Sequence, residues 1–293
     1  MPASHKVAMK LTAIEGNRQW LDGGAMFGHA PKTMWEKWTA VNPDNQIPLA
    51  CRSLLIEVEG SRILCEVGVG DYMQPEMARR YGVEGGGHLL LQNLLQQGVQ
   101  EKDIDFVILS HLHFDHAGGL VPAWPGMNES DWQMRFPNAR FVVGLEQYER
   151  SLHPHARDKA SYVPGLSKRL SESGRLILVG ENGRTGTMLD SHIQYIFTSG
   201  HTPGLMHALI SSGRKKIFFC SDIIPGQAWI HLPIVTAYDR YPELTVNEKS
   251  EILEQAVQED WILFYTHDAE FIASKVLLSD KGRYQASQPS KKF

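Results

Sequence analysis

Hydrophobic and polar positions divide the chain into short apolar runs separated by turn residues. Residues 53–59 (SLLIEVE) and 62–67 (RILCEV) are rich in aliphatic side chains, and Gly60-Ser61 stands between them as a turn signal. This pattern predicts a β-hairpin. Between residues 88 and 97 (HLLLQNLLQQ) leucines recur at helical spacing, and Gly98 follows where a helix would end, which predicts a helix.

Later runs, bounded by Gly, Pro, Asn or Ser, predict further strands at 105–109, 140–143, 175–179, 192–197, 215–220 and 261–265. Helical patterns separate some of them, at 145–151 and 247–259. Many strands mixed with helices indicate a layered α/β or α+β sandwich, although the pattern does not choose the strand order. No short repeat or low-complexity linker divides the chain, so we predict one domain over residues 1–293 with residues 1–50 as an N-terminal extension.

Composition narrows the class of protein. With 42% hydrophobic and 21% charged residues, the 293-residue chain resembles an ordinary globular protein, and its net charge of −4 gives no electrostatic case for a nucleic-acid partner. No apolar stretch approaches the roughly 20 residues that span a membrane. The start of the chain lacks the pattern of a secretory signal. Three widely spaced cysteines in apolar surroundings favour reduced, buried thiols, so we expect a cytoplasmic protein.

Metal-ligating side chains follow four of the predicted strands. Ligands that are distant in sequence converge when each lies just beyond the carboxyl end of a strand. Five imidazoles and two carboxylates are too many for one tetrahedral zinc ion but suit two metals that share a bridging carboxylate. Without a cysteine, the set favours a catalytic centre over a closed structural site. Its members are His111, His113, Asp115, His116, His201, Asp222 and His267.

The competing interpretation is that these are ordinary polar residues. An isolated histidine such as His201 or His267 is more often a hydrogen-bonded or surface residue than a ligand. The cluster in HLHFDH (111–116) differs, because its side chains cannot all be solvated beside an apolar strand, nor all be buried without compensation. Together with the other strand ends, it favours the metal site.

The order HLHFDH, then His201, Asp222 and His267, resembles the ligand sequence of the metallo-β-lactamase superfamily. The resemblance runs from about residue 50 to the end and implies a four-layer αββα sandwich with a dinuclear site on its rim. By motif position, one metal would be held by His111, His113 and His201, the other by Asp115, His116 and His267, and Asp222 would bridge them.

Four further segments are similar to the quorum-quenching, acyl-homoserine-lactone lactonase-like branch of that superfamily: 20–32 (WLDGGAMFGHAPK), 110–119 (SHLHFDHAGG), 199–207 (SGHTPGLMH) and 237–243 (AYDRYPE). The likeness implies a small lactone or ester substrate and a homodimer. Residues 1–50 would then either cover the site or form the dimer contact. Met26 and Phe27 in this segment would be core, dimer contact or lid, and Trp229 would belong to the pocket wall.

The chain departs from the family pattern at two positions. Where the superfamily often has Asp-Thr-Gly after an early strand, this chain has Glu66-Val67-Gly68, so Glu66 would support the site with a longer side chain. Some lactonases carry a tyrosine three residues beyond the bridging aspartate, where this chain has Pro225. Tyr238 or His231 would have to replace that tyrosine.

The implied chemistry is hydrolysis by a hydroxide that bridges two divalent metals, with Asp115 and Asp222 as its catalytic carboxylates and Asp115 as the proton shuttle. Zinc is the default expectation, and iron, manganese or cobalt also suit such ligands. Lactones or related carboxylic esters are the leading substrates. A phosphotriesterase or phosphodiesterase is the alternative, because the same two metals serve phosphorus centres. A non-catalytic relative would usually have lost ligands, whereas this chain keeps all seven.

Overall fold

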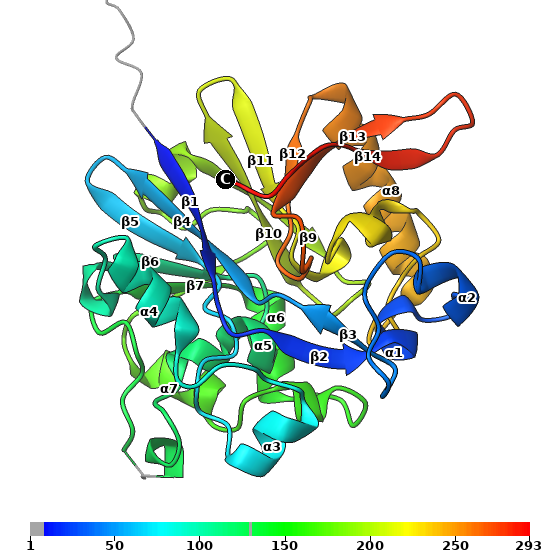
Figure 1. Ribbon diagram of the computed structural model, residues 1–293. Helices are drawn as coiled ribbons and strands as arrows, with labels where there is room; N and C mark the ends of the chain where they lie inside the picture. Colours follow the sequence, from blue (N-terminus) through cyan, green and yellow to red (C-terminus); the bar gives the residue numbers. More distant parts are fainter. Residues whose placement is uncertain (1–8, 129–130) are drawn as a thin grey trace, which may run out of the picture.

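The computed structural model describes residues 9–128 and 131–293, and within them the strands form two stacked six-stranded sheets and a two-stranded ribbon (Figure 1). Residues 1–8, at the start of the chain where no secretory signal is expected, lie outside the described residues. None of the helices in the described part of the chain has the length and apolar character that crossing a membrane requires. The three cysteines are buried and free, as predicted.

The first sheet has the order β1-β4-β5-β6-β7-β8. The predicted hairpin is present, since β4 and β5 pair in antiparallel register and Val58 faces Ser61 across the turn. From β5 to β8 the strands are parallel. The strands are β1 (Lys10–Glu15), β4 (Arg52–Val58), β5 (Ser61–Cys65), β6 (Phe106–Leu109), β7 (Arg140–Gly144) and β8 (Leu176–Val179).

The second sheet has the order β14-β13-β12-β11-β10-β9, with a single parallel pair, β11 and β12, among the described strands. The ribbon consists of β2 (Gln19–Asp22) and β3 (Gln46–Leu49). The sheet strands are β9 (Ile193–Thr198), β10 (Leu205–Ser212), β11 (Lys215–Phe219), β12 (Ile262–Phe264), β13 (Ala273–Leu278) and β14 (Tyr284–Ser290).

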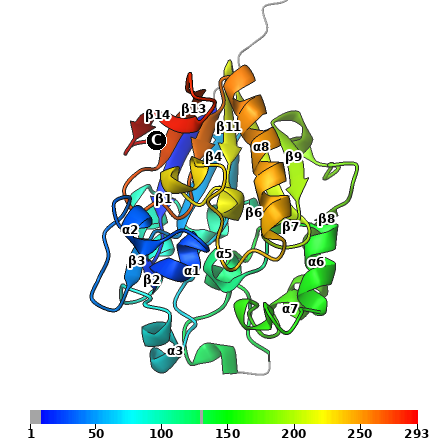
Figure 2. The ribbon, with the colours of Figure 1, turned by 90° about the vertical axis from the view of Figure 1, so that its right-hand side faces the viewer.

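Helices cover the outer face of each sheet, and Figure 2 shows α8 alongside the second sheet. Two predicted helices are confirmed as α4 and α6, and the third is longer than predicted, because α8 begins at Pro242, a residue suited to a first helical turn. The helices are α1 (Gly23–Phe27), α2 (Lys32–Trp35), α3 (Pro75–Arg80), α4 (Leu89–Gln96), α5 (Phe114–Ala117), α6 (Leu145–Leu152), α7 (Leu166–Glu172) and α8 (Pro242–Gln258).

Strand β6 shows how the sequence produces these layers. Its four residues are all buried, and alternate side chains enter different cores: Phe106 and Ile108 join the core between the sheets, whereas Val107 and Leu109 join the core beneath the helices. A strand covered on both faces must be apolar throughout, which explains its unbroken hydrophobic run. The predicted αββα sandwich is confirmed.

Residues 9–50, the described part of the N-terminal extension, are built into the fold. Strand β1 pairs with β4 along its whole length and forms an edge of the first sheet. Phe27 is fully buried, and its ring stacks on Trp35 and Trp229 with centroid distances of 5.3 and 4.6 Å. Of the roles that the sequence left open for Phe27, the structure shows that of a core residue.

Candidate metal centre

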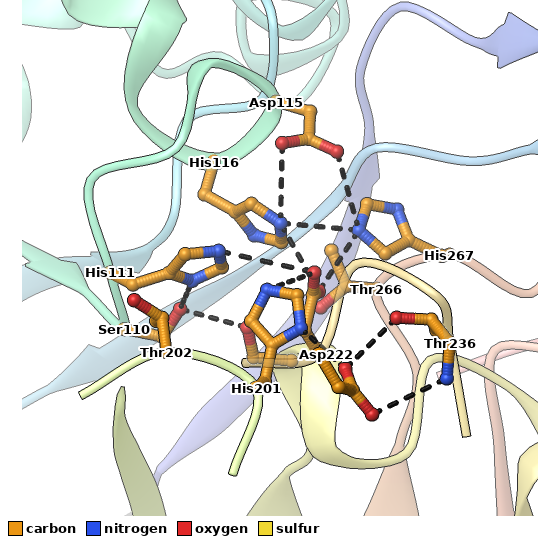
Figure 3. A network of polar contacts seen from close by, with 12 residues as sticks. Ser110, His111, Asp115, His116, His201, Thr202, Asp222, Thr236, Thr266 and His267 are labelled. Carbon is orange, nitrogen blue, oxygen red and sulfur yellow. Dashed lines mark hydrogen bonds and ion pairs between the residues drawn. The ribbon is translucent and has the colours of Figure 1, made fainter. Parts of the chain in front are cut away.

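The candidate ligands that follow four strands lie close together in the fold. Figure 3 shows the side chains of His111, Asp115, His116, His201, Asp222 and His267 next to one another. The loop after β6 and the short helix α5 carry four of these residues, while the loops after β9, β11 and β12 carry one each. All five imidazoles are buried: His111, His113, His116, His201 and His267. The structure therefore brings together all seven residues that the sequence pattern singled out.

The first group consists of His111, His113 and His201, whose ligand nitrogens lie within 4.8 Å of one another. The Nε2 atom of each is buried and has no hydrogen-bond partner. A buried polar atom without a partner is costly, so three of them that converge are typical of a cation site. The donor set fits a divalent metal ion bound by imidazoles.

The second group consists of Asp115, His116 and His267, whose ligand atoms also lie within 4.8 Å of one another. The Nε2 atoms of the two histidines are 3.2 Å apart. The oxygens of Asp115 lie 3.6 Å from the His116 Nε2 atom and 3.7 Å from that of His267. Two imidazoles and a carboxylate directed at one point also fit a divalent metal.

Asp222 lies between the two groups. Its Oδ2 atom is 3.2 Å from Nε2 of His201 and 3.9 Å from Nε2 of His111. Its Oδ1 atom is 3.1 Å from Nε2 of His116 and equally 3.1 Å from Nε2 of His267. Each oxygen of one carboxylate thus faces a different group, as a bridging ligand requires.

Most of the ring orientations at the site are held by an oxygen near Nδ1. The Nδ1 atom of His201 lies 2.9 Å from Asp239 Oδ1, that of His267 lies 2.6 Å from the Ala50 carbonyl oxygen, and that of His111 lies 2.9 Å from Ser110 Oγ. An imidazole that donates its Nδ1 hydrogen keeps the Nε2 lone pair for a metal. These contacts favour the tautomer that metal binding needs.

Charges divide the metal-free site into two kinds of imidazole. Burial and neighbouring imidazoles lower the pKa of His113 to about 3, and burial lowers that of His111 well below its usual range. Burial also opposes protonation of His116 and His267, but the Asp222 carboxylate beside them raises the pKa of both well above the usual value.

Glu66 lies beneath the second group and is 1% exposed. Its Oε2 atom is 2.9 Å from Nδ1 of His116, and Ser221 Oγ donates to its Oε1 atom over 3.0 Å. Ser110 Oγ also donates to that oxygen, and Thr266 Oγ1 approaches Oε2 at 3.4 Å. The longer side chain thus reaches a candidate ligand, His116, from the position where the superfamily often has aspartate.

Two buried residues at the site were missed by the sequence analysis. Asp239 holds His201, and Thr236 Oγ1 donates to the same Asp239 oxygen over 2.9 Å. Gln19 donates from Nε2 to Asp115 Oδ2 over 2.8 Å. Asp239 lies within the segment AYDRYPE, so that segment already contained a signal, whereas nothing around Gln19 indicated its contact.

A cavity of about 240 Å³ opens onto both groups. Met26 and Tyr238 line it, together with apolar side chains such as Leu21 and Phe114. Phe27, Trp229 and His231 instead line a neighbouring cleft of about 640 Å³, which shares only Leu49 and His267 with the first. Of the two residues considered as replacements for the tyrosine missing at Pro225, Tyr238 therefore lines the metal cavity and His231 does not.

Two histidines outside the ligand set are also buried. His88, in the loop directly before α4, is 5% exposed, and its Nε2 atom lies 2.9 Å from the Gly119 carbonyl oxygen. Its ring thus contacts the segment that follows α5. His207 is 0% exposed, and its Nε2 atom lies 2.8 Å from Thr198 Oγ1.

Comparisons with known proteins agree with this geometry. A family model described as Metallo-beta-lactamase superfamily matches residues 47–123. The N-acyl homoserine lactonase AiiA of Bacillus thuringiensis subsp. kurstaki is 25% identical over 244 residues, covering 79% of this chain and 86% of the lactonase.

Solved structures share the fold over nearly the whole chain. A probable metal-dependent hydrolase from Staphylococcus aureus has a TM-score of 0.82 and 28% identity, covering 97% of this chain and 99% of its own. AidC, a dizinc quorum-quenching lactonase, has a TM-score of 0.73 at 20% identity, covering 98% and 96%, which compares the fold alone. The matched motif, the sandwich and these relatives together show that the chain carries a metallo-β-lactamase superfamily domain and is a metallo-hydrolase of that superfamily.

Proposed function

We propose that this protein is a dinuclear-metal-dependent hydrolase that opens lactones or related carboxylic esters. The observation that carries the proposal is the position of Asp222, whose two oxygens face two separate groups of ligand atoms. A site for one metal would not need a second convergent group or a carboxylate between the two.

His111, His113 and His201 would hold one ion and Asp115, His116 and His267 the other, with Asp222 shared between them. Two bound divalent ions would supply a hydroxide near neutral pH and polarise a carbonyl oxygen. Zinc suits this imidazole-rich set, as do iron, manganese and cobalt. Glu66 and Asp239 would orient His116 and His201 through their Nδ1 atoms.

Asp115 is the group that we propose moves the proton. Burial disfavours its charge, yet the imidazoles of His116 and His267 keep its pKa below the usual value, so the carboxylate is ionised at neutral pH. The side-chain amide of Gln19 donates a hydrogen bond to the Oδ2 atom of Asp115. Asp115 also lines the cavity. Asp115 can therefore accept a proton from the attacking water and deliver it to the leaving alkoxide oxygen.

The cavity supports a substrate with an apolar substituent. Leu21, Met26 and Phe114 offer apolar surface beside the ligands, and Tyr238 provides a hydroxyl in the same cavity. Lactones are the substrates named for the relatives with which the chain aligns over most of its length. The proposal includes a homodimer, which rests on the likeness to the lactonases, and a cytoplasmic location, which rests on the buried free thiols.

The test is to purify the protein, count its metals, and compare turnover of acyl-homoserine lactones of several chain lengths with that of a phosphotriester, a phosphodiester and a thioester. We expect two metals per chain and lactones as the best substrates. Asp222→Ala should abolish turnover and reduce the metal count, whereas His153→Gln, at an exposed histidine outside the site, should change neither. Lactone turnover far below that of the phosphotriester would overturn the substrate assignment in favour of the phosphotriesterase alternative.

A further inference from the structure

Glu248 and Lys249 are adjacent charged residues of α8. They belong to neither ligand group, yet both are at least partly buried. Lys249 is 0% exposed, and Glu248 is partly buried. Burying an ammonium or a carboxylate is costly unless hydrogen bonds compensate for the lost water. The contacts of the two residues show which parts of the chain provide that compensation.

Glu248 holds the loop that carries His201. One carboxylate oxygen accepts from the Ser199 backbone N–H over 2.7 Å, and the other accepts from that of Gly200 over 2.9 Å. The carbonyl oxygen of Gly200 in turn accepts a hydrogen bond of 2.8 Å from the N–H of Tyr241, the residue before α8. The backbone immediately before the ligand is thus fixed on the first turns of α8.

Lys249 holds a different segment. Its Nζ atom donates to the carbonyl oxygen of Ile234 over 2.5 Å and approaches that of His231 at 3.4 Å. This segment continues to Thr236 and Asp239, and Asp239 lies 2.9 Å from Nδ1 of His201. Neighbouring residues of a helix project about 100° apart, so Glu248 and Lys249 can reach two separate loops.

Burial lowers the pKa of Lys249 to about 7, and the Asp239 carboxylate opposes that shift. Apolar side chains of the same helix, including Ile252 and Leu253, already attach α8 to the sheet core. Holding the helix in place therefore does not require a buried charge at position 249, since buried charges can often be replaced by apolar residues without loss of stability.

We propose that Glu248 and Lys249 are positioning residues of the metal centre. Glu248 fixes the backbone that carries His201, and Lys249 fixes the loop that carries Asp239, so one helix sets the His201–Asp239 contact from both sides. Ligand geometry must be held within about 0.5 Å to work, which explains why two loops share one rigid support. The inference rests on the proposed metal role of His201 but not on the proposed substrate.

The experiment measures Zn²⁺ affinity by competition with a chelating dye, together with thermal melting of the metal-free protein. The variants are Glu248→Gln and Lys249→Met, with Leu253→Ala as the matched control in the same helix. We expect wild-type protein to bind two ions, and each of the two variants to bind one of them about 10–100-fold more weakly. Leu253→Ala should melt at a lower temperature but keep both affinities. Cobalt-loaded variants should also show an altered visible absorption spectrum, which a loss of stability alone would not produce.

Unchanged Zn²⁺ affinities and cobalt spectra in both variants would overturn this inference and leave the proposed function standing. An equal loss of affinity in Leu253→Ala would also overturn it, because the effect would then be one of general stability. If Lys249→Met does not fold, Glu248→Gln, which keeps the shape of the side chain, decides the question by itself. Wild-type protein that binds no metal would remove the proposed function and this inference together.

Discussion

The Oε2 atom of Glu66 lies 2.9 Å from Nδ1 of His116, in a pocket where the carboxylate is 1% exposed. The φ angle of Glu66 is +64°, a left-handed conformation that non-glycine residues seldom adopt. An uncommon backbone conformation therefore coincides with a buried carboxylate that contacts the ring of a candidate metal ligand. This coincidence makes Glu66 the first residue to test.

Glu66→Gln should weaken metal binding by about 10–100-fold, because it removes the charge that supports His116 while keeping the size of the side chain. The effect should fall on the ion bound by Asp115, His116 and His267. Competition with a chelating dye would measure it, and Glu76→Gln on the exposed face of α3 is the control. Equal affinities in wild type and Glu66→Gln would show that the carboxylate does not support the metal.

Asp239→Asn should weaken binding of the ion that His111, His113 and His201 are proposed to hold. The amide can present its NH₂ group to His201 and stabilise the wrong tautomer, so we expect an affinity lower by about 10–100-fold at this position. Metal content after dialysis against a weak chelator would reveal the loss. Thr236→Val, which removes only the hydroxyl that donates to Asp239, should give a smaller loss. The reverse order would contradict this account of how His201 is oriented.

Gln19→Leu should alter catalysis more than metal content. The substitution removes the hydrogen bond to Asp115 Oδ2, and a carboxylate that loses a donor has a higher pKa. The acidic limb of the kcat profile should therefore move to higher pH, while two metals remain bound. Kinetics across the pH range with parallel metal analysis would test this. A profile that overlays the wild-type one would exclude an influence of Gln19 on the proton shuttle.

The lowered pKa of Lys249 predicts a pH-dependent stability. Burial lowers the pKa from 10.5 in the unfolded chain to about 7 in the folded state, so between these values the unfolded state binds more protons. The free energy of unfolding contributed by this group therefore rises with pH across that window and is constant below about 7 and above 10.5. Urea unfolding of metal-free wild type and Lys249→Met should show the difference in stability shifting toward wild type as pH rises. A pH-independent difference would contradict the prediction.

Gly200→Ala should disturb the packing of the loop that carries His201 against α8. An added Cβ would lie 2.4 Å from both the backbone nitrogen and Oγ1 of Thr245, so the loop or the helix must move. We expect a destabilisation of about 1–3 kcal/mol, as for other overpacked sites, together with weaker metal binding. Gly180→Ala is the control, because nothing lies within 4 Å of the added atom. Thermal melting and metal titration of both variants would test the prediction.

The strands that lead to the site were predictable because their apolar runs are strong and bounded by turn residues. Strand β6 and the predicted strands that became β9, β11 and β12 were all found within one residue of their observed starts. The strands that were not predicted are β1, β2, β3, β13 and β14. Strand β14 has no fully buried residue in its burial pattern, so its sequence lacks the hydrophobic signal on which such predictions depend.

The sequence by itself determined the candidate ligands, since five histidines and two aspartates follow closely after strands whose carboxyl ends converge in a layered sandwich. Only the tertiary structure decided how these ligands are oriented. The atoms that hold the rings and Asp115, from Gln19, Glu66 and Asp239, lie 96, 50 and 38 positions along the chain from the residues that they contact. A hydrogen bond leaves no periodic pattern in the sequence, because it depends on where two distant backbones meet once the hydrophobic cores have formed.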